Sequence, residues 1–186
     1  YNLTLLQGLG THNRFSASTV DQLPKQVAAG YMFGTGVSVA VPDLDRTDYL
    51  LILGANPYAS NGSVCTAPDF PGRIEAIRAR GGKVVVVDPR RTRTAEEADQ
   101  WIAIRPATDA LFLMAIVNVL FAESLVKIQD HIAILLNGLD DVREASREFT
   151  PERVAQATGL EADVIRQVAH ELSAAKTAAL YGRIGT

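Results

Sequence analysis

Two short segments in the first half of the chain consist of apolar residues without alternating polar positions. They cover residues 48–54 and 83–87, and the second contains four consecutive valines. A strand that is apolar on both sides is typical of a parallel sheet that helices cover on both faces. Residues 70–80 have a helical apolar spacing and end at two glycines, Gly81 and Gly82. The sequence therefore predicts a strand–helix–strand unit with a right-handed crossover.

The rest of the chain contains further elements of the same kind. We expect helices at residues 20–29, 94–100, 110–122, 126–137, 139–149, 150–159 and 161–176, and strands at 37–41, 101–104 and 178–182. Ser18 or Thr19 is the expected cap of the first of these helices. The pattern predicts an α/β fold, a Rossmann-like three-layer α/β/α arrangement with a mostly parallel sheet.

The domain organisation follows from this order of elements. We expect residues 1–186 to form a single α/β domain that is a fragment of a larger enzyme. Residues 1–45 are then a lead-in of loop and helix, and residues 124–176 a helical segment. A strand so close to the end of the sequence favours a sheet that is truncated at its C-terminal side.

Polar residues follow the predicted strands where each strand ends, which is where open parallel sheets bind ligands. The loop at 55–63 is rich in Gly, Asn and Ser and can present backbone N–H groups to a phosphate, and Pro57 is expected to prevent a helix directly after the strand. Asp88 and the arginines after it suit a ribose, a base or a phosphate. An Asn-Pro turn and a charged surface turn are the alternatives for these two loops. Asp109 is either a helix cap or a ligand-facing carboxylate.

Composition narrows the classes of partner. The formal net charge of −3 argues against general binding to nucleic acids, and the 47% of hydrophobic residues is normal for a globular chain. The longest apolar stretch, residues 110–122, contains Asn118 and is too short to cross a bilayer, so no membrane insertion is expected. Cys65 is the single cysteine, expected to be buried and inert, and it excludes a disulfide or a cysteine-ligated cluster within the chain. A cytoplasmic location is favoured.

Four segments occur in an order that resembles the molybdopterin oxidoreductase family, which includes formate dehydrogenases, nitrate reductases and dimethyl sulfoxide reductases. They are Leu53–Pro57, Val86–Ala95, Ile104–Ala110 and Thr150–Glu152, and residues 178–182 match the next strand of that family. The resemblance extends over nearly the whole chain but over only a middle part of the usual family length. It implies a domain that binds the guanosine and pyrophosphate end of molybdopterin guanine dinucleotide, in an enzyme that holds two such pterins around one molybdenum or tungsten ion.

The resemblance also implies which residues contact this cofactor. The phosphate and nucleoside loop would be lined by Gly54, Asn56, Pro57, Ser60 and Asn61. The nucleotide would be contacted after the next strand by Asp88, Arg90, Arg91 and Thr92, and the guanine edge would be met by Thr108 and Asp109. A carboxylate accepts hydrogen bonds from the N–H groups of guanine, which agrees with the last assignment. The family usually has glycine where Ala107 stands, and the extra methyl is expected to narrow the approach without abolishing binding.

The metal region departs from the family pattern. Ser16 stands where many members have cysteine or selenocysteine, and serine is the metal ligand in the dimethyl sulfoxide reductase branch. Ser16 is therefore either a metal ligand or a loop hydroxyl or helix cap. His12 is expected to have an ordinary polar role, and His131 and His170 to lie on the surface. The [4Fe-4S] cluster of the family is expected in a part of the enzyme that is not present here.

The favoured function is that of a formate dehydrogenase-like oxidoreductase, in which the metal centre exchanges two electrons with a small-molecule substrate. The partners implied are the rest of the polypeptide and electron-transfer subunits, and this fragment alone is expected to be inactive. One alternative is a metal-free scaffold relative, such as the large iron–sulfur subunit of an NADH dehydrogenase. Another is a generic nucleotide-binding domain. Asp88 and Asp109 favour the first function, because a scaffold does not need carboxylates that face guanine.

Overall fold

The computed structural model describes residues 2–13, 22–62 and 67–183, and the chain divides into two compact units, Tyr1–Val39 and Ala40–Thr186. The first unit contains helix α1, Asn2–Gly8, and helix α3, Leu23–Phe33. Helix α3 starts three residues later than expected, with a proline in its first turn, and ends at Gly34, whose φ of 76° suits a helix terminus. The proposed caps Ser18 and Thr19 lie outside the described residues.

The strand expected at residues 37–41 does not form. Residues 37–41 have no regular secondary structure, and the side chains of Val37, Val39 and Val41 are all exposed. A strand needs a hydrogen-bonding neighbour and a covered apolar face, and among the described residues no strand pairs with this segment. The expectation was wrong because alternating valines indicate a strand only where a partner strand exists.

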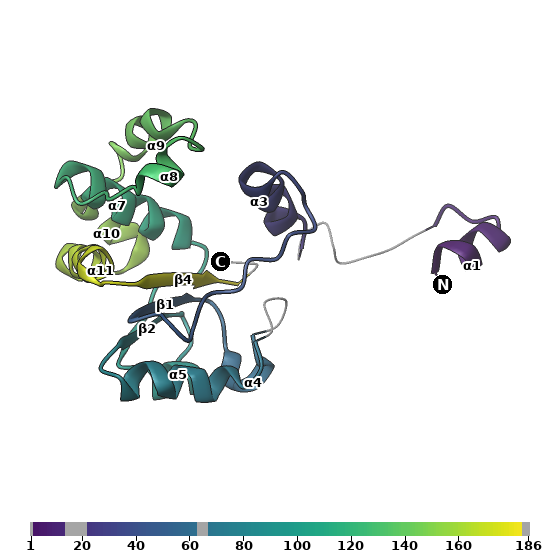
Figure 1. Cartoon of the computed structure of the whole chain (residues 1–186), viewed down its shortest axis with the longest axis horizontal. Coiled ribbons are helices and arrows are strands. Elements are labelled where there is room, and N and C mark those ends of the chain that lie inside the picture. Colours follow the sequence, from purple (N-terminus) through teal and green to yellow (C-terminus); the bar gives the residue numbers. More distant parts are fainter. Residues whose placement is uncertain (1, 14–21, 63–66, 184–186) are drawn as a thin grey trace. The chain divides into compact units, whose positions relative to one another are not determined.

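The second unit is built on a four-stranded sheet in which every strand is parallel to its neighbours. The strands are β1, Tyr49–Leu53; β2, Lys83–Val87; β3, Gln100–Ile102; and β4, Ala178–Gly182, in the order β3-β2-β1-β4. Figure 1 shows β2, β1 and β4 in this order. Tyr49 lies opposite both Lys83 and Ala178, so β1, β2 and β4 start at the same level. The predicted α/β fold with a parallel sheet is confirmed. Strand β3 ends before Ile104, and the N–H of Arg105 donates instead to the carbonyl of Thr158 at 2.9 Å.

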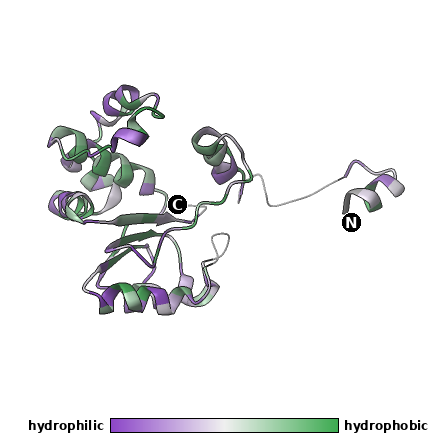
Figure 2. Ribbon diagram, viewed as in Figure 1, coloured by the Kyte–Doolittle hydropathy of each residue, from purple (hydrophilic) through white to green (hydrophobic). Residues whose placement is uncertain are grey.

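Alternate residues of the strands supply two separate cores, one on each face of the sheet. Leu51, Leu53, Val85 and Val87 point to the face covered by α7, Asp109–Ala122; α10, Pro151–Thr158; and α11, Ala162–Ala174. Leu50, Ile52, Val84 and Val86 point to the face covered by α5, Phe70–Ala79. The strands are accordingly coloured as hydrophobic between more mixed helices in Figure 2. This two-sided covering explains why β1 and β2 are apolar throughout.

Four shorter helices complete the unit: α4, Pro57–Ser60; α6, Arg93–Glu97; α8, Asp130–Ala133; and α9, Leu139–Ser146. The long helix expected at 126–137 is wrong, because only α8 forms there. Helix α8 has no buried residue, and Ile134 and Leu135 beside it are 83% and 72% exposed. A helical segment that packs against nothing lacks the tertiary contacts that stabilise most helices in proteins.

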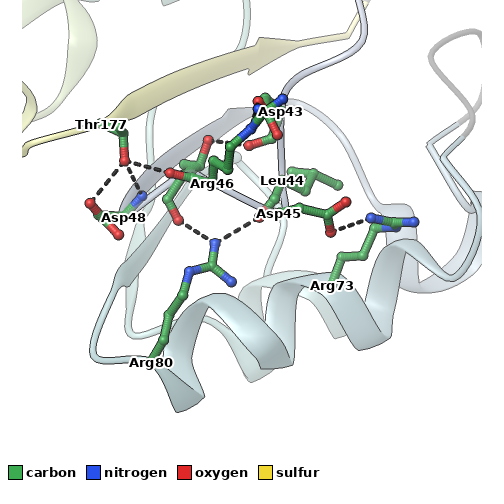
Figure 3. Close-up of polar contacts among 9 residues, drawn as sticks. Asp43, Leu44, Asp45, Arg46, Asp48, Arg73, Arg80 and Thr177 are labelled. Atoms are coloured by element: carbon green, nitrogen blue, oxygen red, sulfur yellow. Dashed lines mark hydrogen bonds and ion pairs between the residues drawn. The ribbon is translucent and has the colours of Figure 1, made fainter.

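The amino ends of β1 and β4 are joined by a polar network around residues 43–48 (Figure 3). Arg80, which follows α5, donates to the carbonyls of Leu44 at 2.7 Å and Thr47 at 2.5 Å. The hydroxyl of Thr177 donates to the carbonyl of Arg46 at 2.6 Å, and Thr177 also bonds to Asp48. Arg73 of α5 pairs with Asp45. These contacts fix the entry into the sheet at the edge opposite to its carboxyl ends.

A second polar cluster at the amino end of the sheet centres on Glu171 of α11. Its carboxylate accepts from Lys83 Nζ at 2.6 and 2.7 Å, from Gln167 at 2.9 Å and from the hydroxyl of Tyr49 at 3.1 Å. Burial opposes ionisation of Glu171, but the hydrogen bonds from Lys83 and Gln167 and the charge of Lys83 outweigh it, so the pKa of Glu171 is lowered. Burial and the neighbouring Glu171 raise the pKa of Tyr49. The cluster ties α11 to β1 and β2.

We expect Glu171→Gln to lower the free energy of unfolding by about 1–3 kcal/mol at pH 7, because two partly buried partners lose a charged acceptor. A folded-state pKa below the ordinary value of 4.5 means that this contribution is present above pH 4.5. It is lost as the pH falls through the lowered pKa. Urea unfolding of both proteins at a series of pH values measures the difference. The exposed pair partner Glu144 gives the control, and Glu144→Gln should change stability by less than about 0.5 kcal/mol. A difference that grows towards low pH would contradict this assignment.

Candidate functional site

Three loops leave the carboxyl edge of the sheet side by side. The backbone connects them there, because Gly54 N–H donates to the carbonyl of Val87 at 2.9 Å and Asp88 N–H donates to the carbonyl of Ile102 at 3.1 Å. Gly54 has a φ of 57°, a conformation that favours glycine, and it turns the chain away from β1. The residues after β1, β2 and β3 therefore begin at one edge, as expected for parallel strands.

The loop after β1 forms helix α4 at once. The expectation that Pro57 prevents a helix was wrong, because Pro57 is the first residue of α4, where its missing N–H costs nothing. Ser60 is exposed and its hydroxyl bonds to the carbonyl of Asn56 at 3.2 Å. Asn61 ends the helix with a φ of 52°, and its Oδ1 accepts from the N–H of Phe70 at 3.0 Å. Asn61 thus supports the start of α5, a role that the sequence did not indicate.

The loop after β2 is ordered by Asp88 and Thr92. Asp88 is 8% exposed, and its Oδ1 accepts from the N–H of Arg90 at 2.8 Å, which makes a tight Asx-type turn. Thr92 is the N-cap of α6 and accepts from the N–H of Ala95 at 3.3 Å. The indole of Trp101 donates to the carbonyl of Asp88 at 2.8 Å. This loop is held in shape by its own backbone and by β3.

Three exposed arginines extend from the same loop. The guanidinium carbon of Arg91 lies 5.8 Å from the ring centre of Trp101, and that of Arg93 lies 5.5 Å from the ring centre of Tyr58. A guanidinium on an aromatic face keeps its donors available to another ligand. Arg90 has no side-chain hydrogen bond or ion pair within the part of the chain that the structure describes. The edge therefore carries positive charge from three exposed arginines.

The third loop brings a buried carboxylate to this edge. Thr108 is the N-cap of α7, and its hydroxyl donates to the carbonyl of Arg105 at 2.7 Å instead of capping the helix. Asp109 is the first helical residue and not the cap. It is 5% exposed, and among the described residues its Oδ1 is buried without a hydrogen-bond partner. Burial, followed by the nearby charge of Asp88, raises the pKa of Asp109.

Asp88 and Asp109 are thus brought together although they are far apart in sequence. The negative charge of Asp88 contributes to the raised pKa of Asp109. Neither carboxylate forms an ion pair with a cation among the described residues. A buried carboxylate oxygen without a hydrogen bond, close to a second carboxylate, is costly unless a ligand donates hydrogen bonds to it. The edge therefore combines buried acceptors on one side with exposed arginines on the other.

Ala107, just before Asp109, has a φ of 63°. This left-handed conformation costs a residue with a Cβ roughly 1–2 kcal/mol and costs glycine none of this strain. The backbone conformation therefore explains why glycine is expected at this position, in addition to any effect that the methyl group of Ala107 has on a ligand. The turn directs the chain from β3 into α7 and so sets the place of Asp109.

We expect Ala107→Gly to raise the free energy of unfolding by up to about 1 kcal/mol. This is the backbone strain that glycine relieves, minus the cost of the extra conformational entropy that glycine loses on folding. The matched control is Ala103→Gly, an exposed position nearby with ordinary φ, which should lower stability by about 0.5–1 kcal/mol. Thermal or urea unfolding measures both variants. Equal signs for the two changes would contradict the role of the backbone at Ala107.

Sequence reasoning missed two residues of this edge. Thr94 is 1% exposed and bonds across to the loop after β1, and Trp101 supports both Asp88 and Arg91. Both contacts join segments from different strands. The sequence carries no signal for such a pairing, although an isolated polar residue at a buried helix position is a weak hint.

Other predicted residues lie elsewhere or outside the described part. Ser16 and Cys65 are outside the described residues, so their roles stay predictions. His131 is exposed and His170 is an exposed partner of Glu123 at 2.6 Å, in agreement with the surface positions expected for them. His12 is also exposed, and its polar role stays a prediction. In the described ranges, no group of three His, Cys, Asp or Glu side chains is arranged to hold a metal ion. Across those same ranges, no helix has both the length and the apolar character to span a bilayer.

Two hollows among the described residues lie away from this edge. One of about 350 Å³ lies between α7 and α9 and is lined in part by Phe121 and Arg143. The other, of about 240 Å³, lies beside the 41–45 segment.

Comparison with known proteins gives consistent matches. The family model described as molybdopterin oxidoreductase matches residues 2–149. The chain is 30% identical over 178 residues to formate dehydrogenase H of Escherichia coli, which covers 95% of this chain and 24% of the relative. It is 29% identical over 134 residues to an F420-dependent formate dehydrogenase subunit alpha of Methanocaldococcus jannaschii, covering 72% and 19%.

A solved structure has the same fold. Acetylene hydratase from Pelobacter acetylenicus superimposes with a TM-score of 0.75 at 26% identity, over 97% of this chain and 24% of that protein. The chain thus spans about a quarter of the length of the relatives that it matches. With a family model that matches most of its residues, this chain belongs to the molybdopterin oxidoreductase family.

Proposed function

We propose that this chain binds the guanosine and pyrophosphate end of molybdopterin guanine dinucleotide in a molybdopterin oxidoreductase. The observation that carries the proposal is the carboxylate of Asp109. Of two buried side-chain oxygens without a hydrogen bond in the described ranges, those of Gln100 and Asp109, only the second is a carboxylate. It stands at the carboxyl edge of the sheet beside Asp88, where a ligand of the fold is expected.

The residues present fit the chemistry of this cofactor. Guanine has N–H donors on one edge and needs acceptors, which Asp109 and Asp88 provide. A pyrophosphate needs donors and positive charge, which the exposed side chains of Arg90 and Arg91 provide. The donor and acceptor groups thus lie at one edge in the combination that a guanosine diphosphate unit requires.

The role of this chain in the reaction is binding and orientation. When bound, the cofactor supplies a molybdenum or tungsten ion that exchanges two electrons with a small substrate. The residues at the sheet edge hold the nucleotide end in a fixed place, and Asp109 and Asp88 select the base. Those steps need no proton transfer by this chain, so no catalytic residue is assigned to it.

Formate dehydrogenase-like activity is the favoured activity of the intact protein. Two of the relatives reported above are named formate dehydrogenases, and one of them matches over 95% of this chain. The structural relative is named acetylene hydratase, so members of similar sequence carry different names. The substrate therefore has to be tested on the intact protein, together with the [4Fe-4S] cluster and electron-transfer partners that we propose for it.

A metal-free scaffold is the second candidate, and the buried carboxylate argues against it. An unpartnered buried charge destabilises a fold, and a scaffold that binds no nucleotide gains nothing in return. A generic nucleotide-binding domain is the third candidate. It shares the guanine site with our proposal but requires neither pterin nor metal.

The experiment that separates these candidates uses the purified full-length protein that contains this sequence. Metal content is measured per polypeptide, and GMP is measured after mild acid has cleaved the pyrophosphate. We expect molybdenum or tungsten at near-stoichiometric level and GMP in about twofold excess over the metal, together with formate-dependent reduction of a dye. Absence of both metal and GMP would support the scaffold, and guanine nucleotide without metal would support the generic module.

A further inference from the structure

One buried hydroxyl joins two of the loops at the carboxyl edge. Thr94 lies in α6, after β2, and is 1% exposed. Its Oγ1 donates to Asn56 Oδ1 at 2.7 Å and accepts from the N–H of Tyr58 at 3.2 Å. Both partners belong to the loop after β1. The hydroxyl therefore uses its single donor and one of its acceptors to bridge the two loops.

This bridge replaces the usual cap of a helix. Asn56 is the N-cap residue of α4, but its side chain makes no capping hydrogen bond to that helix. Its oxygen instead accepts from Thr94, and the Thr94 hydroxyl takes the N–H of Tyr58 in the first turn of α4. The start of α4 is thus satisfied by a residue from a different loop, and so its position depends on α6.

Helix α4 depends on contacts with other elements to hold its place. It has four residues, and a helix of that length is unstable without external contacts. Helix α6, in contrast, is capped by Thr92 and anchored by buried Ala95 in the core beneath the sheet. Thr94 therefore transmits the fixed position of α6 to α4.

We propose that Thr94 is a positioning residue for the nucleotide site: its hydroxyl sets the distance between the loop after β1 and the loop after β2, so that both loops are ordered before the cofactor binds. This inference rests on the proposed function. Thr94 is buried and does not touch the ligand itself. It acts through Asn56 and the first turn of α4, and its effect is on the retention of the cofactor.

The test compares three variants of the full-length protein. Thr94→Val keeps the shape and removes the hydroxyl, and Thr94→Ser keeps the hydroxyl. Thr47→Val is the matched control, since Thr47 is 3% exposed and its hydroxyl donates at 2.6 Å to the carbonyl of Asp43, at the opposite edge of the sheet. Each protein is incubated and gel-filtered, and the GMP that acid releases from the retained cofactor is followed with time.

We expect Thr94→Val to lose the cofactor about tenfold faster than Thr47→Val, and Thr94→Ser to stay within about threefold of the unchanged protein. Hydrogen exchange should quicken at residues 57–61 in Thr94→Val and not in Thr47→Val. Equal loss rates for Thr94→Val and Thr47→Val, or a failure of serine to restore retention, would overturn the role of Thr94. If the unchanged protein releases no GMP, the proposed function itself fails and this proposal fails with it.

Discussion

The variant Asp109→Asn is expected to lose its preference for the guanosine nucleotide GDP and to bind the xanthosine nucleotide XDP more tightly than the unchanged protein does. The carboxylate of Asp109 accepts from the N–H groups of guanine, whereas xanthine has a carbonyl in place of the guanine amino group. That carbonyl is repelled by a carboxylate and accepts from the amide of asparagine. We expect the affinity for GDP to fall roughly 10- to 100-fold, the range for a lost hydrogen bond to a charged group.

The same change is expected to stabilise the protein without ligand. The pKa of Asp109 is raised by burial and by Asp88, so the folded state favours the protonated form. That contribution to stability is present below the unfolded pKa and is lost as the pH rises through the folded pKa. At pH 7, which is above the unfolded pKa, the raised pKa of Asp109 therefore opposes folding, and asparagine removes this cost. The thermal midpoint should rise while GDP binding weakens.

Calorimetric titration with GDP and XDP, and thermal unfolding without nucleotide, measure the two effects. The control is Asp163→Asn, because Asp163 also lies in the first turn of a helix but its side chain is 97% exposed. That variant should keep the preference of the unchanged protein for GDP. An Asp109→Asn protein that still prefers GDP would show that this carboxylate does not read the base.

The second large effect is expected for Phe112→Ala. Phe112 is fully buried in the core between α7 and the sheet, one turn after Asp109. Removal of a buried phenyl ring costs the free energy of transfer and that of the cavity left behind, about 3–5 kcal/mol in total. This is a large part of the stability of a typical domain. The change also loosens the first turn of α7, and so we expect GDP binding to weaken with it.

Urea unfolding measures the loss for Phe112→Ala. The matched control is Leu135→Ala, because Leu135 is 72% exposed, and it should change the unfolding free energy by less than about 0.5 kcal/mol. A loss below about 1 kcal/mol for Phe112→Ala would mean that α7 is not packed on the sheet as described.

The sheet could be predicted because its signal is local. The unbroken apolar runs of β1 and β2 require cover on both faces, and helices then have to lie between and around them. The segment at 126–137 also contains many apolar residues, but the one helix that forms there, α8, buries none of its side chains. A helical pattern in the sequence does not reveal whether the segment has another element to pack against. The same reason explains why residues 37–41 form no strand.

The candidate site was only partly predictable. Asp88 follows β2 directly and Asp109 ends the connection that follows β3, so their common edge follows from the topology. Asn61 and Thr92, by contrast, hold the backbone of their own loops, since one supports the start of α5 and the other caps α6. Thr94 could not be found, because its partners Asn56 and Tyr58 are brought to it by the pairing of β1 with β2 and by no feature of its own neighbourhood.

The central claim is that Asp88 and Asp109 meet one guanine at the carboxyl edge of the sheet. A crystal structure of the full-length protein with its native cofactor tests this claim most directly. We predict that the N–H edge of a guanine lies at hydrogen-bond distance, about 2.7–3.2 Å, from the Asp109 carboxylate. A guanine that lies beyond the reach of both carboxylates, or a sheet edge occupied by protein side chains alone, would contradict the account.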